Sequence, residues 1–180
     1  MSGDAADEAL EAGVSAILRT AIGRLDAADA RDEVIARYRP AGRIALIRRA
    51  PVLLPVTRAW RLGMLLLDRD GNLYETGEVT RAIETKWPSN RSLEVERRRE
   101  VQAAAFRGPF APGEVVNVDA EPIALDAASL RAGSGPLSVG SGSGGGEVVL
   151  VRWAGPGPGS GARSELGAYL ADRVSLLTFD

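Results

Sequence analysis

The chain has 180 residues, of which 45% are apolar, and a formal net charge of −2. It contains no histidine, no cysteine and a single lysine, Lys86. Because imidazole and thiolate groups carry most acid–base and nucleophilic chemistry at neutral pH, this composition excludes histidine triads, cysteine proteases and zinc sites with the usual nitrogen and sulfur ligands.

The length predicts one globular domain over residues 1–180, with a disordered N-terminus at 1–6 and flexible glycine-rich loops at 140–146 and 154–162. No apolar run reaches the roughly 18 residues of a membrane span, and the acidic N-terminus lacks the pattern of a secretion signal. We therefore expect a cytoplasmic protein with no membrane partner.

Charge is distributed unevenly along the chain. Residues 1–33 carry eight acids against three arginines, whereas residues 34–67 carry seven arginines and no acid. Such asymmetry can mark an anion site. The simpler interpretation is that acidic helices lie near basic strands and offset their charge at the surface.

In the first half of the chain, apolar spacing of three and four residues predicts a helix over 7–25 and a shorter one over 29–39, stopped by Pro40. Residues 43–48 are typical of a strand. The prolines in 50–57 indicate an extended segment at a sheet edge or outside the sheet. Residues 60–67 and 73–76, joined by turn residues at 68–72, predict a β-hairpin.

The second half is expected to contain a short strand at 79–83 and a surface helix over 92–106 with Leu93 and Val101 among its inward residues. Strands at 114–118 and 147–153 and a closing helix over 164–177 follow. The pattern predicts an α+β fold: a mostly antiparallel sheet that could be strongly curled, with N-terminal helices, one middle helix and one C-terminal helix.

Two motifs resemble ligand sites without completing them. The spacing Gly140-x-Gly142-x-x-Gly145 matches the dinucleotide fingerprint, but a strand follows it where the phosphate-binding helix should begin, so a hairpin loop is expected. Asp68, Asp70 and Asn72 alternate as calcium-loop ligands do, yet the twelfth position of such a loop would be Val79, and a tight turn accounts for these residues. The sequence thus predicts no cofactor and no metal site.

Two groups of residues remain as candidate sites. Asp119 and Glu121 lie two residues apart after a strand, where a coupled carboxylate pair could supply an acid and a base; solvated loop acids are the alternative. Aromatic and arginine side chains that suit a planar or anionic ligand gather around the hairpin, although packing would also explain the aromatics. These ligand-binding candidates are Trp60, Arg61, Tyr74, Arg81 and Trp87.

The stretch from Trp60 to Tyr74, with Val79-Thr80-Arg81-Ala82, Arg107-Gly108-Pro109-Phe110 and Val151-Arg152-Trp153, resembles a family of small uncharacterised proteins from high-GC Gram-positive bacteria. The resemblance covers roughly residues 60 to 153 and implies a single family-wide domain. Some members are labelled glutaminase, which implies a serine amidohydrolase with a Ser-x-x-Lys pair. The residue three before Lys86 is Ile83, so no catalytic residue is carried over.

These observations favour a non-catalytic binding or protein-interaction domain that contacts an unidentified protein or a small anionic ligand through Arg61 and Arg81. The alternative is a hydrolase, either based on carboxylates such as Asp119 and Glu121 or a glutaminase-like amidohydrolase. Nucleic-acid binding through residues 34–67 is less favoured, because their arginines are interspersed with core-type residues.

Overall fold

The computed structural model describes residues 2–44, 47–84, 92–142, 145–154 and 161–179. Their contacts divide the chain into two compact units. Unit 1 comprises Met1–Arg31, Trp60–Glu75 and Pro122–Asp180, and unit 2 comprises Asp32–Ala59 and Thr76–Glu121. Both units are assembled from separated segments, and the expectation of one domain over residues 1–180 stays a prediction.

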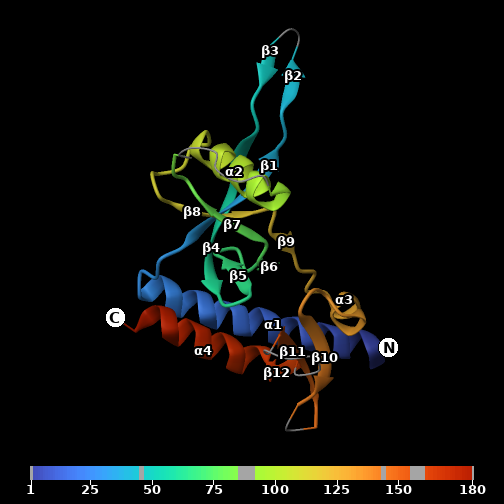
Figure 1. Ribbon diagram of the computed structural model, residues 1–180. Helices are drawn as coiled ribbons and strands as arrows, with labels where there is room; N and C mark the ends of the chain where they lie inside the picture. Colours follow the sequence, from blue (N-terminus) through green and yellow to red (C-terminus); the bar gives the residue numbers. More distant parts are fainter. Residues whose placement is uncertain (1, 45–46, 85–91, 143–144, 155–160, 180) are drawn as a thin grey trace. The chain divides into compact units, whose positions relative to one another are not determined.

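Unit 1 is built on two helices that lie side by side, α1 (Ser2–Ala27) and α4 (Leu166–Thr178) (Figure 1). Their three- and four-residue apolar spacing places one buried stripe on each helix. The stripes consist of Leu10, Val14, Leu18, Ala21 and Leu25 on α1 and Leu166, Tyr169, Leu170 and Val174 on α4. Both predicted helices are confirmed, but residues 2–6, expected to be disordered, form the start of α1.

The rest of the C-terminal part of unit 1 combines a short helix, α3 (Ala127–Ala132), with three antiparallel strands, β10 (Leu137–Ser141), β11 (Glu147–Ala154) and β12 (Gly161–Glu165). Strand β11 corresponds to the strand predicted over 147–153. Gly140, expected in a flexible loop, pairs with Val148 inside the ladder, and Gly161 begins β12. Of the two expected loops, residues 143–144 and 155–160 lie outside the described residues.

The predicted hairpin is present in unit 1 as β5 (Leu65–Asp68) and β6 (Leu73–Glu75). The expected strand 60–67 is interrupted at Gly63, whose φ of 70° ends β4 (Val52–Leu62) and starts a turn. Residues 52–59 of β4 belong to unit 2, and residues 60–62 belong to unit 1. The short strand β9 (Glu121–Pro122) likewise spans the division between the units.

Unit 2 contains a mixed sheet in the order β7-β8-β1-β4, formed by β7 (Glu78–Arg81), β8 (Val115–Val118), β1 (Glu33–Arg39) and the first part of β4. Strands β1 and β8 are parallel, and the other pairs are antiparallel. Helix α2 (Leu93–Phe106) packs on one face through Val101, Ala104 and Ala105. Leu93, expected to point inward, is 82% exposed.

The helix expected over 29–39 is wrong, because these residues form strand β1. Val34, Ile35 and Ala36 are all buried in succession, which a strand covered on both faces achieves and a one-sided helix does not. Pro55 lies within the sheet opposite Ala36, where the register skips Val56. The bulge lies on β4, the last strand in the unit 2 order, and it accommodates Pro55, which has no amide hydrogen to donate to the ladder.

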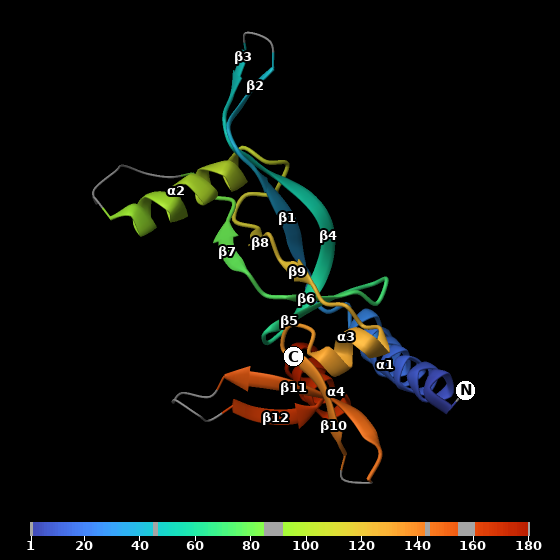
Figure 2. The ribbon, with the colours of Figure 1, turned by 90° about the vertical axis from the view of Figure 1, so that its right-hand side faces the viewer.

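Beyond this sheet, β1 and β4 continue into a two-stranded ribbon formed by β2 (Gly42–Ile44) and β3 (Ile47–Arg49). The single strand predicted over 43–48 is therefore an antiparallel pair. In both ribbon views the pair extends past the end of α2 (Figures 1 and 2).

The α+β class and the mostly antiparallel pairing are confirmed, and the sheet does not close on itself. There is one N-terminal helix where two were expected, and α3 is additional. No helix within the described ranges has the length and apolar character that a bilayer span requires.

Candidate functional site

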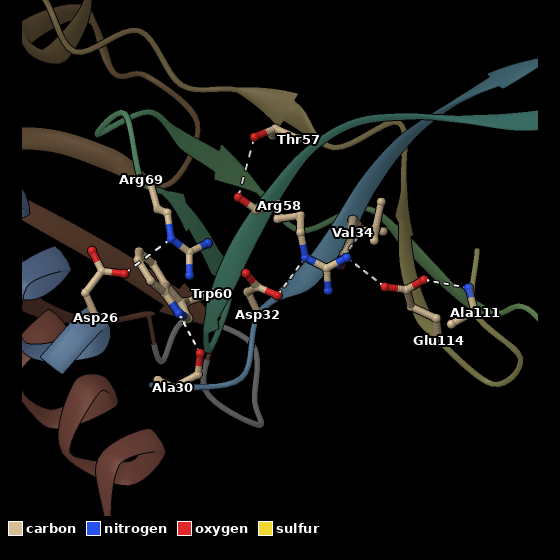
Figure 3. A network of polar contacts seen from close by, with 11 residues as sticks. Asp26, Ala30, Asp32, Val34, Thr57, Arg58, Trp60, Arg69, Ala111 and Glu114 are labelled. Carbon is tan, nitrogen blue, oxygen red and sulfur yellow. Dashed lines mark hydrogen bonds and ion pairs between the residues drawn. The ribbon is translucent and has the colours of Figure 1, made fainter. Parts of the chain in front are cut away.

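Trp60, predicted to contact a ligand, is a core residue of unit 1. Its side chain is fully buried, and its Nε1 donates a hydrogen bond to the carbonyl oxygen of Ala30 at 2.9 Å. The guanidinium carbon of Arg69 lies 4.5 Å from the centre of the indole ring (Figure 3). Packing therefore explains Trp60, and its ring is covered on the side where a ligand would stack.

Tyr74, on β6, is hydrogen-bonded to the polar turn that closes the β5–β6 hairpin. Its hydroxyl donates to Oδ2 of Asp68 at 3.0 Å, and Asn72 Nδ2 donates to the same oxygen at 3.0 Å. Asp68 Oδ1 accepts the backbone N–H groups of Asp70 and Asn72 at 3.0 and 2.8 Å. Asp68 is only 2% exposed, and both oxygens of its carboxylate are occupied by these four hydrogen bonds. The tight-turn interpretation of these residues is confirmed.

The remaining ligand candidates do not form one described group. Arg61 is half-buried in unit 1, whereas Arg81 is exposed in unit 2. Trp87 lies outside the described residues. The ligand-binding hypothesis thus stays a prediction for Arg61 and Arg81.

Asp119 and Glu121, the candidate catalytic acids, engage different partners in unit 2. Asp119 has a φ of 51°, accepts the N–H of Tyr38 at 2.9 Å and donates its own N–H to Ala36 at 2.9 Å. Glu121 lies 3.8 Å from Nη1 of Arg37, and both side chains are largely exposed. Asp119 fastens the end of β8 to β1, and these contacts do not couple the two carboxylates.

A second polar cluster lies between β1 and α2. The Tyr38 hydroxyl donates to Oε1 of Glu100 at 2.7 Å, and burial together with this hydrogen bond raises the pKa of Tyr38 to about 12. Arg97 lies 5.5 Å from the Tyr38 ring centre, and its Nε is 3.9 Å from Glu78. The cluster anchors α2 to the sheet and balances the charge of Glu78.

Arg58 is neutralised by two acids of unit 2 (Figure 3). Its Nε donates to Asp32 at 2.7 Å and its Nη1 to Glu114 at 2.8 Å, while the other oxygen of Glu114 accepts the N–H of Ala111 at 2.9 Å. The hydrogen bond from Arg58 holds the pKa of Glu114 below its ordinary value. Arg58 is one of the seven arginines of residues 34–67, but its two acidic partners leave it unavailable to an anion.

The surface that best fits a binding site is a hollow of about 630 Å³ beside β7. Val79, Arg81 and Ile83 alternate along the strand and its extension, so they share one face. Val79 and Ile83 are 48% and 43% exposed. Helix α2 contributes the opposite side of the hollow. The full lining is Glu78, Val79, Thr80, Arg81, Ile83, Arg98 and Gln102.

Two smaller hollows, of about 250 and 220 Å³, lie along α1 and α4 in unit 1 and share Ile17 and Gly167. Their linings are mainly small and apolar side chains. No group of three or more acidic side chains that could hold a metal ion occurs within the described ranges. The hollow beside β7 is distinguished by two arginines that line it together, Arg81 and Arg98.

Arg98 and Ile83 were missed as site residues, although signals for both exist in the sequence. The alternation of Val79, Arg81 and Ile83 is typical of a strand with one open face, and Arg98 lies in the run of three arginines on the predicted surface helix. What the sequence lacks is any mark that this helix packs beside this strand.

Comparison with protein-family models, curated proteins and solved structures finds no match to this chain. The resemblance over residues 60–153 therefore stays a prediction.

Proposed function

We propose that the chain is a non-catalytic binding domain that holds an extended, acidic protein segment in the hollow beside β7. The observation that carries the proposal is the joint placement of Arg81 and Arg98 with the exposed apolar side chains of Val79 and Ile83 in one hollow. Cationic and apolar contacts within one depression suit a chain that alternates acidic and apolar residues.

The backbone of β7 supports this mode of binding. β7 ends the strand order of unit 2 and pairs with β8 alone within the described residues. An edge strand presents N–H and C=O groups to which an extended segment can add by main-chain hydrogen bonds. Alternate side chains of that segment would then face Val79, Arg81 and Ile83.

The charge around the hollow favours an acidic segment. Glu78 is the acid in the lining, and it lies 3.9 Å from Arg97. Arg98 is 3.3 Å from Glu94, but both side chains are about three-quarters exposed, so this pair contributes little and leaves Arg98 able to exchange partners.

The test is fluorescence anisotropy with a labelled peptide of alternating glutamate and valine. Arg81→Ala and Arg98→Ala should each weaken binding roughly tenfold, equivalent to about 1.4 kcal/mol. The matched control is Arg19→Ala, an exposed arginine on α1, which should leave binding unchanged. The same peptide with N-methylated backbone amides should lose most of its affinity, because strand addition needs those donors.

Two results would contradict the proposal. In the first, both arginine variants bind the peptide as tightly as the parent chain. In the second, the purified protein hydrolyses glutamine and a single substitution abolishes that activity, which would favour the amidohydrolase alternative.

A further inference from the structure

The feature with the most unopposed charge is the ribbon beyond the unit 2 sheet, here called the basic ribbon and defined as residues 37–44 and 47–51. The β1–β4 ladder ends at Arg39 opposite Val52, and the β2–β3 ladder runs from Gly42 opposite Arg49 to Ile44 opposite Ile47. Tyr38 and Leu53 form the last pair that packs into the core. The six residues that follow Tyr38, as far as Ile44, span up to about 20 Å when extended. The ribbon therefore stands clear of its core (Figures 1 and 2).

Arg37, Arg39, Arg43 and Arg49 of the basic ribbon are exposed and largely unpaired. Arg39, Arg43 and Arg49 form no hydrogen bond or ion pair with any residue that the structure describes. Arg37 has Glu121 at 3.8 Å, and side chains that are 50% and 75% exposed make this a weak pair. No acidic residue occurs between positions 34 and 67, so the ribbon itself cannot neutralise them.

We propose that the basic ribbon binds double-stranded DNA through its phosphates. In the sequence, the arginines of residues 34–67 are interspersed with core-type residues, which disfavours nucleic-acid binding. Arg58 fits this expectation, because Asp32 and Glu114 neutralise it, whereas Arg43 and Arg49 lie outside the core. This site is separate from the hollow beside β7.

The arrangement of the arginines favours DNA over an anionic membrane. Successive strand residues point to opposite faces, so Arg49, which pairs with Gly42, and Arg43 occupy opposite faces of the ribbon. The major groove of B-DNA is about 12 Å wide, admits a two-stranded ribbon and has phosphates along both walls. A planar lipid surface would meet one face of the ribbon at a time. Because the contacts are to phosphates, binding should be independent of base sequence.

The test is anisotropy of the full-length protein with a fluorescent DNA duplex of about twenty base pairs, from about 50 to 200 mM salt. Four phosphate contacts predict a slope of about −3.6 in a plot of log affinity against log salt concentration. The double variant Arg43→Ala/Arg49→Ala should bring the slope to about −1.8 and weaken binding at low salt at least tenfold. Its matched control is Arg152→Ala/Arg163→Ala, an exposed arginine pair opposite each other on β11 and β12, which should leave the slope unchanged.

Three results would overturn the inference: no binding to the duplex at about 50 mM salt, an unchanged slope in the Arg43/Arg49 variant, or a loss as large in the Arg152/Arg163 control. Binding to phosphatidylserine vesicles without binding to the duplex would also overturn it, in favour of a membrane surface. Thermal unfolding of each variant should match the parent chain, because the substituted side chains are exposed. Arg81→Ala should leave DNA binding intact, so failure of this inference and failure of the peptide-binding proposal are distinguishable.

Discussion

Replacing Asp68 by alanine should destabilise unit 1 by about 3 kcal/mol. The buried carboxylate accepts four hydrogen bonds, two from backbone N–H groups and two from the side chains of Asn72 and Tyr74. A hydrogen bond to a charged acceptor contributes about 1.5 to 3 kcal/mol. Asp70 and Asn72 are exposed, so water can replace the three hydrogen bonds that they donate in the variant. The bond from the half-buried Tyr74 hydroxyl, at the upper value, corresponds to about 3 kcal/mol.

The assay is urea unfolding followed by circular dichroism. With a slope of about 2 kcal/mol per molar urea, Asp68→Ala should lower the midpoint by about 1.5 M. Asp68→Asn should lose less, because its carbonyl oxygen can still accept both backbone N–H groups. Asp70→Ala is the matched control in the same turn, and its exposed side chain should matter by at most about 0.5 kcal/mol. A loss of less than about 1 kcal/mol in Asp68→Ala, or an equal loss in Asp70→Ala, would refute this role of the Asp68 carboxylate.

Three further substitutions test local contacts. Because the pKa of Tyr38 is raised from 10.0 to about 12, the unfolded chain loses this proton first as pH rises; the associated stability is complete below pH 10 and is lost between pH 10 and 12. Tyr38→Phe should remove up to about 1.3 kcal/mol of that alkaline loss, measured by comparing urea unfolding at pH 9 and pH 11, and an unchanged loss would show that another group is responsible. Gly77→Ala should destabilise by about 1 to 3 kcal/mol, because its Cβ would lie 2.8 Å from the carbonyl oxygen of Val118. Gly23→Ala, on an open face of α1, should instead stabilise by about 0.5 to 1 kcal/mol, and equal effects of the two in thermal unfolding would contradict the contacts described.

The elements that the sequence predicts well are those with a complete local signal. The apolar stripe of α1 and the turn residues between β5 and β6 are each contained in one short window. Strand β1 was mistaken for a helix because Val34, Ile35 and Tyr38 also fit helical spacing, and its burial depends on β4 and β8, which come later in the chain.

The candidate site was only partly predictable for the same reason. Arg81 was identified from its neighbours in sequence, whereas Arg98 joins it through the packing of α2 beside β7. Trp60 looked like a ligand contact because an exposed and a buried indole have the same sequence signature; the hydrogen bond to Ala30 that distinguishes them is made across 30 positions. Asp119 and Glu121 are neighbours in sequence, yet each is engaged by a different residue of β1.

The pairing of α1 with α4 has a consequence for synthesis on the ribosome. About 140 residues separate the end of the first helix from the start of the second, and at 5 to 20 residues per second the ribosome needs roughly 7 to 28 s to make them. During that time Leu10, Val14, Leu18 and Leu25 have no α4 to cover them. The nascent chain thus exposes a hydrophobic stripe until α4 has been synthesised, a state in which a general chaperone that binds apolar segments would protect it from aggregation.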